Sequence, residues 1–150
     1  MKNKMRKLGI DYGEARVGVA ITDALNITVQ GLETIQRNNS DKVILRRLDE
    51  ILKQYEIDTI VVGMPLNMNG TISERAKVTE EFIHKLKCKY NTIKIEKIDE
   101  RLTTVAAHKT MNFLEVNKHK KRNIVDTISA VYILETYLNK LKNALQNNEK

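Results

Sequence analysis

Three acidic residues, Asp11, Glu100 and Asp126, fall where the sequence pattern brings structural elements to a common edge. Carboxylates held at one point repel one another, and a fold seldom gathers them without a compensating cation. Clustered oxygen ligands without histidine or cysteine suit hard divalent ions, Mg²⁺ or Mn²⁺. Two such ions, about 4 Å apart, activate a water molecule and neutralise the leaving oxygen in phosphodiester hydrolysis. We therefore take these three residues as candidate catalytic residues and metal ligands.

Each carboxylate also has a purely structural explanation. Asp11 could shape the turn that follows it, as aspartate often does. Glu100, with Asp99 beside it, could favour the start of a following helix. Asp126, three residues after Asn123, suits the dipole of a helix's first turn. For any one residue alone the structural explanation is the stronger, so the hypothesis of a site depends on all three converging.

The hydrophobic pattern predicts the elements that position these residues. Apolar residues alternate between residues 6 and 36, with a turn at 13–15, which predicts three strands in an antiparallel meander. The third strand, 27–35, is less apolar and is expected at an edge. A helix is predicted over 40–55 with Ser40 as its N-cap. The continuous apolar run 57–64 predicts a strand covered on both faces.

The second half alternates between helices and strands. Thr71 and Glu74 form a T-x-x-E capping box that predicts a helix, with Ile72 on its apolar face. A strand is predicted at 93–98 and a short helix near Thr103. A long final helix is predicted from about 123 to 145, with these residues facing inward: Ile128, Val131, Leu134, Leu138, Leu141 and Leu145.

This order predicts an α/β fold in a single domain, 1–150, with a mixed five-stranded sheet flanked by helices. Right-handed crossovers make the first, fourth and fifth strands parallel, so that their carboxyl ends meet at one edge. Open α/β sheets bind their ligands at that edge. Asp11 ends the first strand, Glu100 follows the fifth, and the helix that carries Asp126 must pack back on the sheet.

The charge balance favours an anionic partner, with nucleic acid the first candidate. Lysine and arginine number 26 against 19 acidic residues, a net charge of +7. Arg101 lies beside Glu100, and the run Lys118, His119, Lys120, Lys121, Arg122 forms a predicted basic loop just before Asp126. A solvated loop is the alternative interpretation of that run.

Composition excludes several other classes. The single cysteine, Cys88, excludes a disulfide scaffold and any four-cysteine metal site. No apolar run approaches the roughly 20 residues of a membrane helix, and Asp11 interrupts the stretch that could form a signal-peptide core. We expect a soluble, cytoplasmic protein. With 5% aromatic residues and no tryptophan, affinity for nucleic acid should come from phosphate contacts rather than base stacking.

Four segments resemble a known family in order and spacing. They are GIDYGEARVGVAITD (9–23), VVGMPLNMNGT (61–71), DERLTT (99–104) and VDTISAVYILETYL (125–138). Together they are similar to the YqgF/RuvX family, described both as Holliday junction resolvases and as pre-16S rRNA nucleases of the RNase H-like superfamily. The resemblance extends over residues 7–137, nearly the whole chain.

The resemblance implies an RNase H-like fold and a metal-dependent nuclease that trims the 5′ end of the small-subunit ribosomal RNA precursor. It places the acidic site at Asp11, Glu100 and Asp126. Arg16, Asn67, Asn69 and Gly70 also match family positions, and we expect substrate or structural roles for them. Phosphate-backbone contacts are expected from these residues: Arg16, Arg101, Lys120, Lys121 and Arg122. The better-known junction resolvases carry a fourth carboxylate three residues after the last one, where this chain has Ser129.

Several alternatives stay open at this point. The chain could cut branched DNA as a Holliday junction resolvase, which would require a dimer, or bind nucleic acid without cleaving it. RNA is favoured over DNA by the resemblance alone, because no residue is identified as a reader of the 2′-hydroxyl. The residues also leave open endonucleolytic or exonucleolytic cutting, one or two metal ions, and a monomer or a weak dimer.

Overall fold

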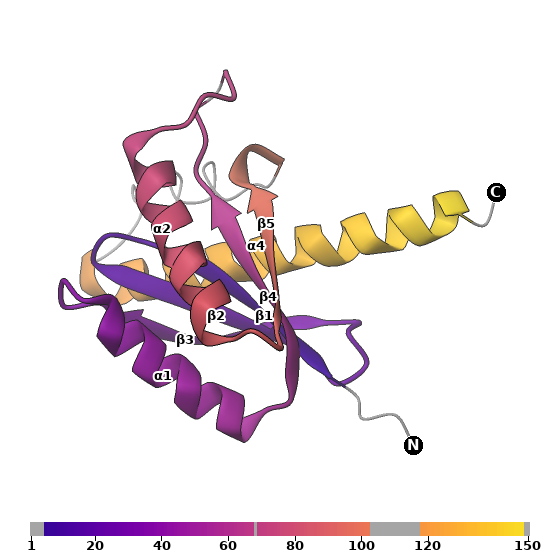
Figure 1. Ribbon diagram of the computed structural model, residues 1–150, viewed down its shortest axis with the longest axis horizontal. Helices are drawn as coiled ribbons and strands as arrows, with labels where there is room; N and C mark the ends of the chain where they lie inside the picture. The colour runs from indigo at the N-terminus through magenta and orange to yellow at the C-terminus, as the bar shows by residue number, and fades with distance from the viewer. Residues whose placement is uncertain (1–4, 68, 103–117, 149–150) are drawn as a thin grey trace.

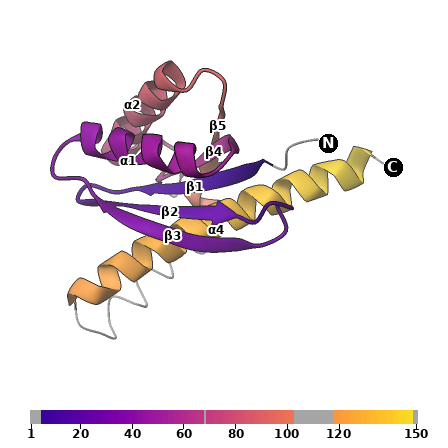
Figure 2. The ribbon, with the colours of Figure 1, turned by 90° about the horizontal axis from the view of Figure 1, so that it is seen from below.

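The computed structural model describes residues 5–67, 69–102 and 118–148, without the side chains of 118–126 and 148. A five-stranded sheet in the order β3-β2-β1-β4-β5 separates α1 and α2 on one face from α4 on the other (Figures 1 and 2). The elements are β1 (Arg6–Tyr12), β2 (Arg16–Thr22), β3 (Val29–Gln36), α1 (Asp41–Gln54), β4 (Ile57–Met64), α2 (Glu74–Lys89), β5 (Lys94–Asp99), the 3-10 turn η1 (Glu100–Leu102) and α4 (Lys118–Asn148).

Strand pairing confirms the mixed sheet. β1 pairs with β2, and β2 with β3, in antiparallel register, whereas β1–β4 and β4–β5 are parallel. The carboxyl ends of β1, β4 and β5 therefore lie at the same edge of the sheet, as the alternation of strands and helices predicts. β3 lies at an edge, also as predicted. Among the described helices, none is both long and apolar enough to cross a membrane.

The two helices on the first face show one prediction confirmed and one wrong. Ser40 caps α1, its hydroxyl accepting a hydrogen bond from the Lys42 amide. The N-cap of α2 is Ser73 rather than Thr71. The Thr71 hydroxyl instead bonds Asn67 and Asn69 within the preceding loop. Because the helix begins two residues later than the capping box predicts, Ile72 lies outside it and is 61% exposed.

The final helix begins earlier than predicted. α4 starts at Lys118, so residues 118–122 are helical and the prediction of a basic loop is wrong there. Asp126 consequently lies about two turns into the helix rather than in its first turn. The helix dipole acts within the first turn, so it does not account for an acidic residue at this position. The helix predicted near Thr103 falls outside the described residues.

The buried face of α4 also differs from the prediction. Its buried apolar residues are Ala130, Ile133, Leu134 and Tyr137, whereas of the predicted inward set only Leu134 is fully buried. Leu141 and Leu145 are 36% and 66% exposed, because the carboxyl end of α4 extends past the sheet (Figures 1 and 2). The leucine spacing continues beyond the last strand that could cover it.

Glycines allow α4 to lie close to the sheet. A Cβ on Gly9 would stand 2.8 Å from both the Ala130 carbonyl oxygen and Leu134 Cβ. The α4 face of the sheet carries Ala20, Val61 and Ile98, while the larger apolar residues of β1 and β2 pack against α1 and α2. The α4 face of the sheet thus carries fewer large apolar side chains than the opposite face. The candidate site lies on this α4 face.

Candidate active site at the carboxyl edge of the sheet

Asp11 lies on the α4 face of β1. Leu8, Ile10 and Tyr12 belong to the core under α1 and α2, and side chains alternate between faces along a strand. Asp11 therefore points the other way, as Gly9 does toward α4. Asp11 lies one residue before the end of β1 and is only 2% exposed. A carboxylate so deeply buried requires compensating partners, because desolvation strongly disfavours an isolated charge.

Glu100 occupies the space that Gly63 leaves empty. Gly63 pairs with Ile98 on β5, and Glu100 is the first residue after that strand. Its Oε1 lies 2.8 Å from the point where a Cβ on Gly63 would stand. The register Ile10–Val62 places Gly63 beside Asp11 on the neighbouring strand, about 5 Å away at the backbone. Asp11 and Glu100 are thus brought to one face over adjoining strands.

The backbone of α4 brings Asp126 to the level of Asp11 along the sheet. Asp11 pairs with Gly18, and Gly18 pairs with Thr34 on β3. The hydroxyls of Thr34 and Thr127 lie 2.7 Å apart, which fixes the residue after Asp126 at the level of Asp11. The Asp126 side chain itself is outside the described residues. Within the described part of the chain, no three His, Cys, Asp or Glu side chains gather as a metal cluster.

Arg101 is paired with Asp99 and lies beside Gly70. Its guanidinium donates to both Asp99 oxygens, at 2.6 Å from Nη2 to Oδ2 and 3.1 Å from Nε to Oδ1. These hydrogen bonds hold the pKa of Asp99 below its ordinary value. Arg101 Nη1 also lies 3.3 Å from the point where a Cβ on Gly70 would stand, and Gly70 has a φ of +85° that favours glycine. The guanidinium therefore lies between the turn after β5 and the β4–α2 loop.

The other predicted substrate residues lie around this edge. Asn67 and Asn69 are exposed in the β4–α2 loop, where both side chains bond Thr71 and so shape the loop. Arg16 begins β2, next to the turn that follows β1. Lys120, Lys121 and Arg122 belong to the amino end of α4, and their side chains are outside the described residues. Direct substrate contact by these residues stays a prediction.

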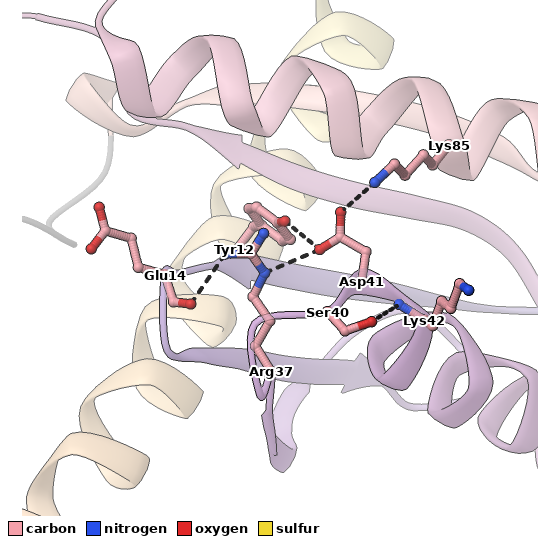
Figure 3. Close-up of polar contacts among 7 residues, drawn as sticks. All are labelled: Tyr12, Glu14, Arg37, Ser40, Asp41, Lys42 and Lys85. Atoms are coloured by element: carbon pink, nitrogen blue, oxygen red, sulfur yellow. Dashed lines mark hydrogen bonds and ion pairs between the residues drawn. The ribbon is translucent and has the colours of Figure 1, made fainter.

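Sequence reasoning missed a polar cluster on the opposite face of β1. The Asp41 carboxylate accepts hydrogen bonds from Tyr12 Oη at 2.5 Å, Arg37 Nε at 3.1 Å and Lys85 Nζ at 2.8 Å (Figure 3). Burial raises the pKa of Asp41, but the hydrogen bonds from Lys85, Tyr12 and Arg37 outweigh it and hold the pKa below its ordinary value. Burial and Asp41 both raise the pKa of Tyr12, so the phenol stays protonated and donates. In the sequence, the only indication of this cluster is the spacing of Arg37 and Asp41, four residues apart on either side of the predicted Ser40 cap.

We expect this cluster to make the protein acid-sensitive. A carboxylate whose pKa is lower in the folded than in the unfolded chain stabilises the fold above about pH 4, and that stability is lost as the pH falls through the folded pKa. Asp41→Asn should therefore be less stable than the wild type at pH 6 but lose less on acidification. Urea denaturation between pH 6 and 2.5 measures this. Other acidic residues contribute equally to both proteins. The expectation would therefore be contradicted if the free energies of unfolding of the wild type and Asp41→Asn fell in parallel with pH.

Comparison of the sequence with known proteins identifies close relatives. The RuvX family, described as Holliday junction resolvase, matches residues 5–140. A protein of Ruminiclostridium cellulolyticum is 52% identical over 137 residues, covering 91% of this chain and 96% of its own length. One of Acetivibrio thermocellus is 48% identical over 134 residues, covering 89% of this chain and 95% of its own length. Both are named "Putative pre-16S rRNA nuclease".

Solved structures share the fold at low sequence identity. RuvC of Thermus thermophilus in complex with a Holliday junction substrate has a TM-score of 0.52 at 12% identity, over 91% of this chain and 96% of that one. The Holliday junction resolvase of fowlpox virus has a TM-score of 0.54 at 17% identity, over 91% of this chain and 99% of that one. The mixed sheet flanked by helices is therefore the RNase H-like fold of RuvC-type nucleases.

Proposed function

The chain belongs to the RuvX family, and from that premise we propose that it is a divalent-metal-dependent nuclease that trims the 5′ end of the 16S ribosomal RNA precursor. The observation that carries the proposal is the placing of Asp11, buried at 2% exposure, beside Glu100 on the α4 face at the carboxyl edge of the sheet. The names of the two relatives support the choice of RNA. We place the activity in the cytoplasm, where bacterial ribosomes are assembled.

The residues present fit a hard divalent ion. Asp11 and Glu100 offer carboxylate oxygens on one face, and we propose Asp126 as the third ligand. Ser129, one turn further along α4, adds a fully buried hydroxyl for which the described residues provide no hydrogen-bond partner. An all-oxygen donor set suits Mg²⁺ or Mn²⁺. When bound, such an ion lowers the pKa of a water molecule and offsets negative charge on the phosphate.

The chain's own residues supply the positioning of substrate. Asp99 orients the Arg101 guanidinium next to Glu100, while the Arg101 side chain keeps 33% of its surface exposed. A guanidinium already oriented by a carboxylate loses little conformational entropy when it contacts a phosphate. We propose that Arg16, Lys120, Lys121 and Arg122 extend this basic surface along the RNA backbone, with Asn67 and Asn69 shaping its rim.

A paired carboxylate variant tests the proposal. The wild type should cut an RNA spanning the 5′ end of the 16S precursor in Mn²⁺, and Glu100→Gln should lose this activity. Glu96→Gln is the matched control, because Glu96 lies on β5, the strand that precedes Glu100, but pairs with Lys94 at 3.1 Å near the amino end of that strand. Mn²⁺ should raise the melting temperature of the wild type and of Glu96→Gln but not of Glu100→Gln.

The description of the family and the RuvC complex favour a second candidate, cleavage of four-way DNA junctions. A synthetic junction assayed beside the RNA separates the two, and sedimentation separates a monomer from the dimer that symmetric junction cutting requires. Cleavage of the junction alone would replace the RNA substrate in this proposal. Binding of either substrate without cleavage, with no Mn²⁺ effect on melting, would indicate a non-catalytic nucleic-acid-binding factor.

A further inference from the structure

We propose that Asp41, with Tyr12, Arg37 and Lys85, forms a latch that positions Asp11 from the opposite face of the sheet. We call these four residues the Asp41 latch (Figure 3). They act as positioning residues and do not touch substrate. The inference rests on the nuclease function proposed above, since it assigns the latch a role in that reaction.

Tyr12 links the latch directly to Asp11. It follows Asp11 in β1, and its ring stacks on Phe82 with centroids 4.2 Å apart. Its hydroxyl donates to Asp41, so the side chain is held at both the ring and the oxygen. Asp11 and Tyr12 are consecutive residues of β1, so a displacement of the backbone at Tyr12 also displaces the Cα of Asp11, whose side chain points to the other face. Contacts that hold Tyr12 therefore limit the movement of β1 at Asp11.

Arg37 contacts the turn between β1 and β2. Its guanidinium lies over the Tyr12 ring, 5.1 Å from the centroid. Nη1 donates to the Glu14 carbonyl at 3.1 Å, and the Arg37 amide donates to the Ala15 carbonyl at 2.9 Å. Arg37 thus adds two backbone contacts to a turn between β1 and β2 that the Gly13 amide also closes on the Arg16 carbonyl at 3.0 Å, and Asp41 holds the Nε of Arg37.

Asp41 is a rigid anchor for these contacts. It lies in the first turn of α1, behind the Ser40 cap, where the helix dipole favours a negative charge. Lys85 on α2 supplies a third donor, and only 10% of the Asp41 side chain is exposed. The latch thereby ties β1, the segment before α1, α1 and α2 to a single carboxylate.

Packing alone does not hold the turn on this side. A cavity of about 100 Å³ separates the Gly13–Glu14 turn from the first turns of α2, where Glu74, Arg75 and Val78 line it. An open cavity offers no close contacts that would keep the backbone in place. On this side the polar contacts of Asp41 and Arg37 therefore add to the β1–β2 pairing and the Gly13–Arg16 backbone hydrogen bond in holding the end of β1.

The chain contains a matched control at the other end of the same two helices. Tyr90, at the end of α2, donates to Asp49 on α1 at 2.7 Å, and Lys89 pairs with Asp49 at 2.8 Å. Tyr90 is buried like Tyr12. For both tyrosines the pKa is raised mainly by burial and further by the aspartate that accepts the hydrogen bond. This second cluster has the same tyrosine–aspartate and lysine–aspartate pairs without a counterpart of Arg37 among the described contacts, and none of its described partners lies on β1.

The experiment compares Tyr12→Phe and Asp41→Asn with Tyr90→Phe and Asp49→Asn. All four should lose similar stability in urea. The latch variants should lower kcat for Mn²⁺-dependent RNA cleavage about 10- to 100-fold with little change in KM, because small displacements of a reacting group are costly. They should also raise, several-fold, the Mn²⁺ concentration that gives half of the maximal rise in melting temperature. The control variants should stay within about twofold of the wild type in both measurements.

Equal losses of kcat and Mn²⁺ response in both pairs would overturn the latch, because they would indicate a general effect of stability. So would full activity and Mn²⁺ response in the latch variants. If the wild type does not cut the RNA, the proposed function fails, while the Mn²⁺ titration of the melting temperature still decides whether the latch positions Asp11.

Discussion

Asp11→Asn is expected to reduce Mn²⁺-dependent cleavage of precursor RNA about a thousandfold or more, while RNA binding stays equal or becomes tighter. Asparagine has the shape of aspartate, so β1 and its neighbours should keep their packing. The amide carries no charge, however, and cannot offset a divalent cation on the α4 face. Removing a negative charge from a surface that binds phosphates also lessens their repulsion, which is why binding should not fall.

Asp58→Asn provides the control for this result. Asp58 lies at the amino end of β4, opposite the carboxyl edge of the sheet, and pairs with Lys7 at 3.0 Å. Asp58→Asn should leave cleavage within about twofold, because Asp58 lies at the end of the sheet opposite Asp11 and Glu100. Cleavage and binding are measured on the same labelled RNA, with binding in Ca²⁺ or without metal. Cleavage by Asp11→Asn at the wild-type rate would refute the assignment of Asp11.

The sheet and two of its carboxylates could be predicted because local pattern and topology act together there. Alternation over β1 and β2 and the apolar run of β4 each predict a strand without knowledge of the rest. Right-handed crossovers then bring the ends of β1, β4 and β5 to one edge, which places Asp11 and Glu100 close together. Asp126 stays a prediction, supported by the Thr34–Thr127 contact beside it.

The features that the sequence did not reveal depend on partners distant in the chain or on where an element stops being covered. Asp41 meets Tyr12 and Lys85 only because the sheet and α2 fold around α1. Of the inward set that the leucine spacing of α4 predicts, only Leu134 is fully buried, because the spacing takes no account of glycines in the strands beneath. Those glycines admit Ala130 and Leu134 at close range.

Gly9→Ala should lower the free energy of unfolding by about 2–3 kcal/mol, the upper range for overpacking a well-packed core. The added Cβ would lie 2.8 Å from the Ala130 carbonyl oxygen and from Leu134 Cβ. Neither atom can rotate away, because one belongs to the α4 backbone and the other is attached to it, so the helix itself must rise. Elsewhere in a strand, alanine would be favoured over glycine by roughly 0.5–1 kcal/mol, so the expected sign is specific to this contact.

Gly63→Ala separates helix displacement from damage to the site. There the added Cβ would meet Ile133 Cδ1 at 2.5 Å and Glu100 Oε1 at 2.8 Å, both ends of flexible side chains that can move. We expect a smaller loss of stability, below about 1 kcal/mol, but at least a tenfold loss of cleavage, because the displaced group is the Glu100 carboxylate. Urea denaturation and cleavage at saturating Mn²⁺ measure the two effects. Wild-type stability in Gly9→Ala, or wild-type cleavage in Gly63→Ala, would contradict the close approach of α4 and the placing of Glu100, respectively.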